Sequence, residues 1–189
     1  MTAPHNGASQ GEHGDSGRIE LMVPTPDLED ACRACEMAFA ATGERFLGPR
    51  ADDWAAFIHL CAEEAAGRVT KPGHVPQSVY ILARVEQDGS RVALGVSKLR
   101  HTLTPALEDV GGHIGYAVRP DERGKGYGTR ILALTLPHAR ELGLERVLLT
   151  CDADNLRSAR VIMRNGGVLT SEGHSPLRGA RVCRYWIAL

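Results

Sequence analysis

The chain has 189 residues, enough for one sizeable core and too few for two domains of ordinary size. Its formal net charge is −1, so no overall field attracts it to nucleic acid or to an anionic membrane surface. No apolar run approaches the ~20 residues that a membrane-spanning helix requires. We therefore expect neither a nucleic-acid partner nor a membrane partner.

The first 17 residues are polar, and they are rich in Gly, Ser, His and Asp. They lack the apolar centre of a secretion signal. We expect residues 1–17 to be a disordered tail, residues 18–189 to form one domain, and the protein to be cytoplasmic.

The first half of the chain predicts three strands and two helices. A short strand at residues 19–23 ends at two prolines, and helices follow at residues 27–41 and 52–66, each with a glycine behind it. The charged loop at residues 44–50 is a candidate substrate-facing segment. Apolar, β-branched runs at residues 79–86 and 91–100 flank an Asp-Gly pair, which indicates a hairpin.

The second half alternates strands and helices. A strand is expected at residues 111–119, and helical spacing at residues 126–142 and 155–165 flanks a buried-type strand at residues 146–151. Two last strands are expected at residues 168–172 and 181–188. This order predicts an α/β or α+β domain with a mixed sheet and helices on its faces.

The five cysteines are scattered, and two of them, Cys32 and Cys35, form a CxxC inside a predicted helix. No second Cys/His pair stands at zinc-site spacing, and the eight histidines show no HxxxH or HExxH spacing. We expect buried thiols and no metal site.

A glycine-rich loop follows the strand at residues 111–119 and reads Arg123-Gly124-Lys125-Gly126-Tyr127-Gly128. Glycines let a backbone approach a ligand closely, and the unpaired N–H groups of a first helical turn bind phosphate. The spacing fits neither the P-loop nor the dinucleotide pattern GxGxxG. It fits the pattern Arg/Gln-x-x-Gly-x-Gly/Ala.

In this context the loop resembles that of the GNAT superfamily of N-acetyltransferases. Val118-x-Pro120 is similar to the end of the family's fourth strand, and the strand leading to Asn155 is similar to its fifth. The helix that ends at Gly166-Gly167 is similar to the family's next helix. The resemblance implies a mostly antiparallel sheet of about seven strands, splayed between strands four and five, with helices on both faces.

The resemblance implies acetyl-CoA as the co-substrate, with its pyrophosphate on the backbone N–H groups of the loop and its pantetheine along strand four. Arg123 and Lys125 either add charge there or form a solvated loop surface. Asn155 either contacts pantetheine or caps the following helix. The implied cofactor residues are Tyr116, Val118, Arg123, Gly124, Lys125, Gly126, Tyr127, Gly128, Thr129, Asn155 and Ser158.

The implied reaction is direct attack of a neutral amine on the thioester, so a base must remove a proton. Counting back from Arg123 puts the family's strand-four base on or near His113, whose imidazole titrates in the right range. Glu108 is the next candidate. The alternative for His113 is a structural histidine at the surface.

One position departs from the family pattern. Many members carry a tyrosine seven residues after the Asn, as general acid toward the leaving thiolate, and here that position is Ile162. The alternatives for the acid are Cys151, Tyr127 and water, and we expect Cys151 to be mainly a buried, small apolar residue.

We expect an N-acetyltransferase whose acceptor is the primary amine of a small molecule. The alternatives are acetylation of a protein N-terminus or lysine, and an inactive acyl-CoA-binding regulatory module. A cleft left open by the segment 44–66 would favour a protein acceptor. The last hairpin, with His174 and Arg178, is expected to shape the acceptor pocket, and a homodimer through the C-terminal strands is the family-level expectation.

Overall fold

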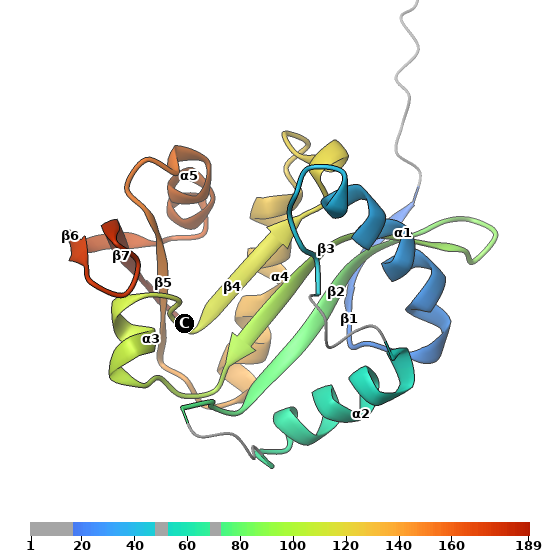
Figure 1. Ribbon diagram of the computed structural model, residues 1–189, viewed down its shortest axis with the longest axis horizontal. Coiled ribbons are helices and arrows are strands. Elements are labelled where there is room, and N and C mark those ends of the chain that lie inside the picture. The colour runs from blue at the N-terminus through green and yellow to red at the C-terminus, as the bar shows by residue number, and fades with distance from the viewer. Residues whose placement is uncertain (1–16, 48–52, 69–72) are drawn as a thin grey trace, which may run out of the picture.

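Two sheets lie side by side in the computed structural model, which describes residues 17–47, 53–68 and 73–189 (Figure 1). The first has the strand order β1-β2-β3-β4 and the second the order β5-β7-β6, and every ladder between described strands is antiparallel. The strands are β1 (Arg18–Met22), β2 (Gln77–Val85), β3 (Arg91–Arg100), β4 (Ile114–Val118), β5 (Arg146–Asp152), β6 (Val168–Ser175) and β7 (Ala180–Ala188).

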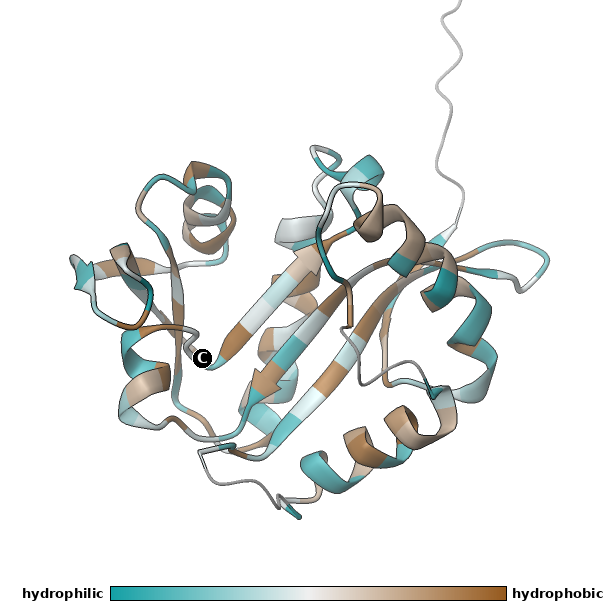
Figure 2. Cartoon of the chain, in the orientation of Figure 1, coloured by the Kyte–Doolittle hydropathy of each residue, from teal (hydrophilic) through white to brown (hydrophobic). Residues whose placement is uncertain are grey.

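Helices cover both faces of the first sheet. The helices are α1 (Glu29–Ala40), α2 (Trp54–Ala65), α3 (Pro105–Asp109), α4 (Tyr127–Glu141) and α5 (Leu156–Arg164), with 3-10 turns η1 (Pro26–Leu28) and η3 (Pro120–Glu122). Val79 and Ile81 of β2 pack with α1 and α2, whereas Tyr80 and Leu82 pack with α4 on the other face. Figure 2 shows the resulting mixture of apolar and polar residues along the central strands. The expected splayed architecture with helices on both faces is confirmed.

The junction between the two sheets is made by hydrogen bonds just before β4 rather than by a strand ladder. The His113 N–H donates to the Leu148 carbonyl over 2.7 Å, and the Leu148 N–H donates to His113 Nδ1 over 2.9 Å. The Gly111 N–H donates to Thr150 Oγ1 over 2.8 Å. Beyond these contacts no ladder joins the described parts of β4 and β5, so the two strands separate here.

Some local predictions were wrong. The predicted strand at residues 111–119 is only β4, because Gly111 and Gly112 have positive φ values of 115° and 63°. The short helix α3 was not predicted, although its Thr104-Pro105 start is a cap signal, and Thr104 Oγ1 accepts from the Leu107 N–H. The predicted strand at residues 168–172 extends to Ser175.

Several predictions fall on residues outside the described ranges. These are the tail at residues 1–16, residues 48–50 of the candidate substrate-facing loop, and Asp52 at the predicted start of the second helix. Cys32 and Cys35 are buried in the core, as expected, and burial raises the pKa of each thiol to about 12. No helix in the described ranges combines the length and the apolarity needed to cross a membrane.

Candidate functional site

Helix α4 begins without a side-chain cap. Its N-cap is Gly126, with φ 88°, which makes no side-chain cap hydrogen bond. By contrast α2, α3 and α5 are capped by Asp53, Thr104 and Asn155. The main-chain N–H groups of a helix start and the positive end of the helix dipole make the start of α4 a site for an anion.

The start of α4 faces a cavity of about 710 Å³, here called the loop cavity, between the Gly-rich loop, β4 and α5. Of the predicted cofactor residues, Lys125 is absent from the described lining. The residues that the cavity brings together are Tyr116, Val118, Arg123, Gly124, Gly126, Tyr127, Gly128, Thr129, Asn155 and Ser158.

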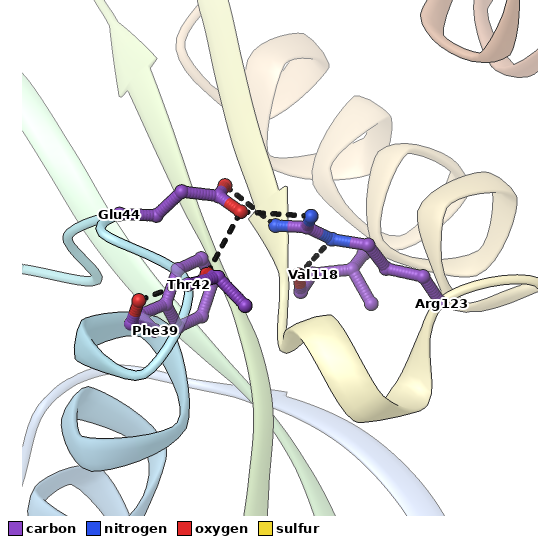
Figure 3. Close-up of polar contacts among 5 residues, drawn as sticks. All are labelled: Phe39, Thr42, Glu44, Val118 and Arg123. Atoms are coloured by element: carbon purple, nitrogen blue, oxygen red, sulfur yellow. Dashed lines mark hydrogen bonds and ion pairs between the residues drawn. The ribbon is translucent and has the colours of Figure 1, made fainter.

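The side chains of Arg123 and Lys125 each pair with a carboxylate, and Figure 3 shows the pair of Arg123 with Glu44. The Arg123 guanidinium donates to both Glu44 oxygens over 2.9 and 2.7 Å, and its Nε donates to the Val118 carbonyl over 3.0 Å. Lys125 Nζ donates to Glu122 over 2.8 Å. The Arg123–Glu44 contact braces the loop against the segment that follows α1, so neither cation is left to face the cavity without a carboxylate partner.

Helix α5 supplies the positive charge that faces the loop cavity. Arg157, Arg160 and Arg164 all line it, with the spacing of one helix face. Sequence reasoning missed these residues, although their three- and four-residue spacing behind the Asn155 cap was a readable signal. They stand across the cavity from the uncapped start of α4.

The free edge of β4 offers main-chain groups to the same space. The Arg100 N–H donates to the His113 carbonyl and the Arg119 N–H to the Leu94 carbonyl. Because hydrogen-bonded pairs alternate along an antiparallel ladder, the main-chain groups of Tyr116 and Val118 point away from β3. They therefore point toward the gap that β5 leaves open.

A second cavity of about 310 Å³, here called the junction cavity, opens where β4 and β5 separate. Tyr116, Asn155 and Ser158 line both cavities. The Tyr116 hydroxyl lies 3.0 Å from Ser158 Oγ, and burial raises the pKa of Tyr116 to about 12. Burial also raises the pKa of Cys151, beside them, to about 11, so this thiol is protonated near neutral pH.

The junction cavity reaches through the gap to the opposite face of the sheet. Leu149 and Cys151 of β5 face the core on the α5 side, so the alternating residues Thr150 and Asp152 face the other way. Arg178, in the turn between β6 and β7, donates to Asp152 over 2.8 and 2.6 Å. The cavity is lined on this side by Arg100, Gly111, Thr150, Asp152 and Arg178.

Neither of the two predicted catalytic residues is part of the described lining of these cavities. His113 is 7% exposed, and its Nδ1 lone pair accepts from the Leu148 N–H. Burial, and then the charge of Arg100, lower the pKa of His113 to about 4. Glu108 is exposed on α3. The geometry therefore favours a bridging role for His113.

The profile of the Acetyltransferase (GNAT) domain matches residues 21–168. The chain belongs to the GNAT acetyltransferase family. Similar solved structures include RimJ from Mycobacterium smegmatis in complex with CoA-disulfide, with 20% identity and a TM-score of 0.64, covering 91% of this chain and 82% of RimJ. No curated protein matches the chain in sequence.

Two further structures are similar to this GNAT protein. RimL, a ribosomal alpha-N-protein acetyltransferase in complex with coenzyme A, shares 18% identity with a TM-score of 0.62, covering 92% of this chain and 95% of RimL. The microcin self-immunity acetyltransferase MccE, in complex with acetyl-CoA and AMP, shares 14% identity with a TM-score of 0.62, covering 93% of this chain and 94% of MccE. At these identities the likeness shows the GNAT fold.

Ile162 stands at the position of the family's general-acid tyrosine, and Asn155 stands at the position of the family's Asn. Ile162 is fully buried in the core under α5. Asn155 Oδ1 accepts from the Ser158 N–H, which is the capping role, while the residue also lines both cavities. Ser158 stands one helical turn before Ile162, so this GNAT protein has a hydroxyl on the helix face where many members carry tyrosine.

Proposed function

We propose that this GNAT protein transfers the acetyl group of acetyl-CoA to the primary amine of a small molecule. The observation that carries the proposal is the meeting of two cavities at Tyr116, Asn155 and Ser158. One cavity has the positive charge and the helix N-terminus that suit a phosphorylated donor, and the other opens on the opposite face. RimL and MccE, solved with coenzyme A and acetyl-CoA, support the same donor.

In the proposed complex the donor runs from the start of α4 to the gap between β4 and β5. Its pyrophosphate rests on the main-chain N–H groups from Gly124 to Thr129, and the arginines of α5 neutralise further phosphate charge. Its pantetheine amides pair with the main-chain groups of Tyr116, which point away from β3, as an added strand would, while the Val118 carbonyl stays with Arg123. The thioester then lies beside Ser158.

The proposed chemistry is a direct transfer. The amine nitrogen bonds to the thioester carbon while the carbon–sulfur bond breaks, and the Val118 N–H stabilises the developing oxyanion. The amine proton leaves to water, CoA departs as the thiolate and is protonated from solvent, and the Ser158–Tyr116 hydroxyl pair donates a hydrogen bond to the departing sulfur. Burial raises the pKa of Tyr116 to about 12, so its hydroxyl remains a donor, and the pair takes the place of the tyrosine absent at Ile162.

Gly126→Ala is expected to raise the Kd for acetyl-CoA about tenfold or more, because φ is 88° and an added methyl group would stand where phosphate approaches main-chain N–H groups. The matched control is Gly143→Ala, which has φ 79° and nothing within 4 Å, at the other end of α4. It should lose similar stability and keep its Kd. Isothermal titration calorimetry measures the Kd for acetyl-CoA in both variants, and equal Kd values in Gly126→Ala and Gly143→Ala would contradict the phosphate site.

The activity itself is tested with purified protein, acetyl-CoA and a panel of primary amines, with release of the CoA thiol as the readout. Amine-dependent thiol release is expected. Tight binding of acetyl-CoA with no release above the rate without amine, across the whole panel, would contradict the proposed transfer and favour a binding module.

A protein N-terminus is the second candidate acceptor. No described residue between positions 44 and 66 lines the junction cavity, so the described part of this segment does not narrow the cavity. RimL is a ribosomal alpha-N-protein acetyltransferase, which points the same way. Short peptides with a free N-terminus and an amidated C-terminus, included in the same panel, separate the two candidates.

A further inference from the structure

Arg100, the last residue of β3, stands at the side of the junction cavity that faces away from α5. Its Nη1 donates to the carbonyl oxygens of Gly112 over 2.9 Å and Gly111 over 3.4 Å. A Cβ on Gly115 would lie 3.9 Å from the same nitrogen. The guanidinium is therefore held next to β4, one residue from Tyr116, where the two cavities meet.

No carboxylate among the described residues balances the charge of Arg100. No described carboxylate pairs with it, and its Nε and Nη2 have no hydrogen-bond partner among the described residues. Asp152, the one carboxylate in the described lining, is held by both nitrogens of Arg178. His113 nearby is neutral, because burial lowers its pKa to about 4. The lining thus carries two guanidinium groups against one carboxylate, a surplus of one positive charge.

A half-buried guanidinium with free donors suits a bidentate carboxylate or phosphate better than a neutral group. Burial lowers the pKa of Arg100, the direction that desolvation gives when no opposite charge offsets it. Asp152 still has lone pairs for an ammonium group. The cavity therefore offers a carboxylate for the positive charge of a zwitterion and the Arg100 guanidinium for its negative charge.

We propose that the junction cavity binds an acceptor amine that carries its own anionic group, a carboxylate or a phosphate, and that the Arg100 guanidinium contacts this group. The inference rests on the proposed acetyl transfer and narrows its acceptor to small amino acids or amino phosphates. A protein N-terminus has its carboxyl group tied up in a peptide bond, so it would leave Arg100 unpaired.

Matched acceptors test this in the wild-type protein. L-leucine is compared with L-leucinamide, and O-phosphoethanolamine with ethanolamine, at saturating acetyl-CoA with thiol release as the readout. The anionic member of at least one pair should have a kcat/KM about 10- to 100-fold higher, the worth of one charge-assisted contact. The amide's α-amino group, with a pKa of about 7.7–8.0, is the more readily deprotonated, so chemistry alone would favour the amide.

Variants of Arg100 test whether this residue causes the preference for the anionic acceptor. Arg100→Gln should raise KM for the anionic acceptor about 10- to 100-fold and leave KM for acetyl-CoA and the neutral acceptor within about twofold. Arg100→Lys keeps the charge without the planar fork, so it should retain part of the preference even if the glutamine variant folds poorly. The control is Arg140→Gln, a charge removal at an exposed site on α4 outside both cavities.

The kinetic and binding results distinguish a failure of the Arg100 inference from a failure of the proposed acetyl transfer. Turnover of neutral amines and peptides with no preference for the anionic members would overturn the inference and leave acetyl transfer standing. So would an equal loss toward both members of a pair in Arg100→Gln. Calorimetric binding of O-phosphoethanolamine to the CoA-loaded protein, weakened by Arg100→Gln without any turnover, would support the inference and contradict the transfer.

Discussion

Gly112→Ala is expected to lower the free energy of unfolding by about 2–4 kcal/mol, the sum of a left-handed backbone angle and an overpacked contact. Gly112 has φ 63°, and an added Cβ would lie 2.3 Å from the Leu148 carbonyl oxygen and 3.1 Å from Leu149 Cα. Both neighbours are backbone atoms of β5 and cannot rotate away. The methyl group would therefore push β4 and β5 apart at their junction.

Urea unfolding, followed by circular dichroism, measures the effect, and Gly89→Ala is the matched control. Gly89 has φ 82° in the hairpin between β2 and β3, with nothing within 4 Å, so its alanine variant carries the backbone cost alone. Equal losses in the two variants would mean that the close approach to Leu148 does not matter. If the junction matters, Gly112→Ala should also lose acetyl transfer, because Tyr116 and Ser158 move relative to each other.

The features that were predictable depend on neighbours in the sequence. The hairpin of β2 and β3 follows from two apolar runs around Asp88-Gly89, and Gly89 has the positive φ that such a turn requires. The Gly-rich loop and the uncapped start of α4 lie within six residues of each other, so one motif predicts both. Short α3, by contrast, spans little more than one turn, which is too short for a periodic signal.

Apart from Arg178, which the sequence placed in the last hairpin beside the acceptor, the lining of the junction cavity was unpredictable because it is assembled from distant segments. Arg178 and Asp152 are 26 residues apart, and Arg123 and Glu44 are 79 residues apart. The motif suggested free cations at the loop, whereas folding supplies a carboxylate partner for each of them. Arg100 ends a regular strand and carries no motif signal, and the packing of Gly111 and Gly112 over it makes it half-buried.

His113→Ala is expected to lower the free energy of unfolding by about 2–4 kcal/mol, since it leaves the buried Leu148 N–H without an acceptor and removes a buried ring. His113→Asn is the informative partner, because its Oδ1 is attached at the same place as Nδ1 and can accept the same hydrogen bond. A bridging role predicts that stability and kcat/KM fall together in the alanine variant and recover together in the asparagine variant. A general-base role predicts that both variants lose about 100-fold or more in kcat, whatever their stability.

The pH dependence of stability gives an independent measure of the same bridge. His113 has a folded pKa of about 4, while an unfolded histidine titrates near 6.5. As pH falls from about 6.5 toward 4, the unfolded chain binds a proton that the folded protein excludes, so the bridge stabilises the fold above this window and loses that contribution within it. Urea midpoints should therefore fall more steeply over this range in the wild type than in His113→Asn. Parallel slopes would mean that the imidazole is protonated in the folded state, where its Nδ1 could no longer accept from Leu148.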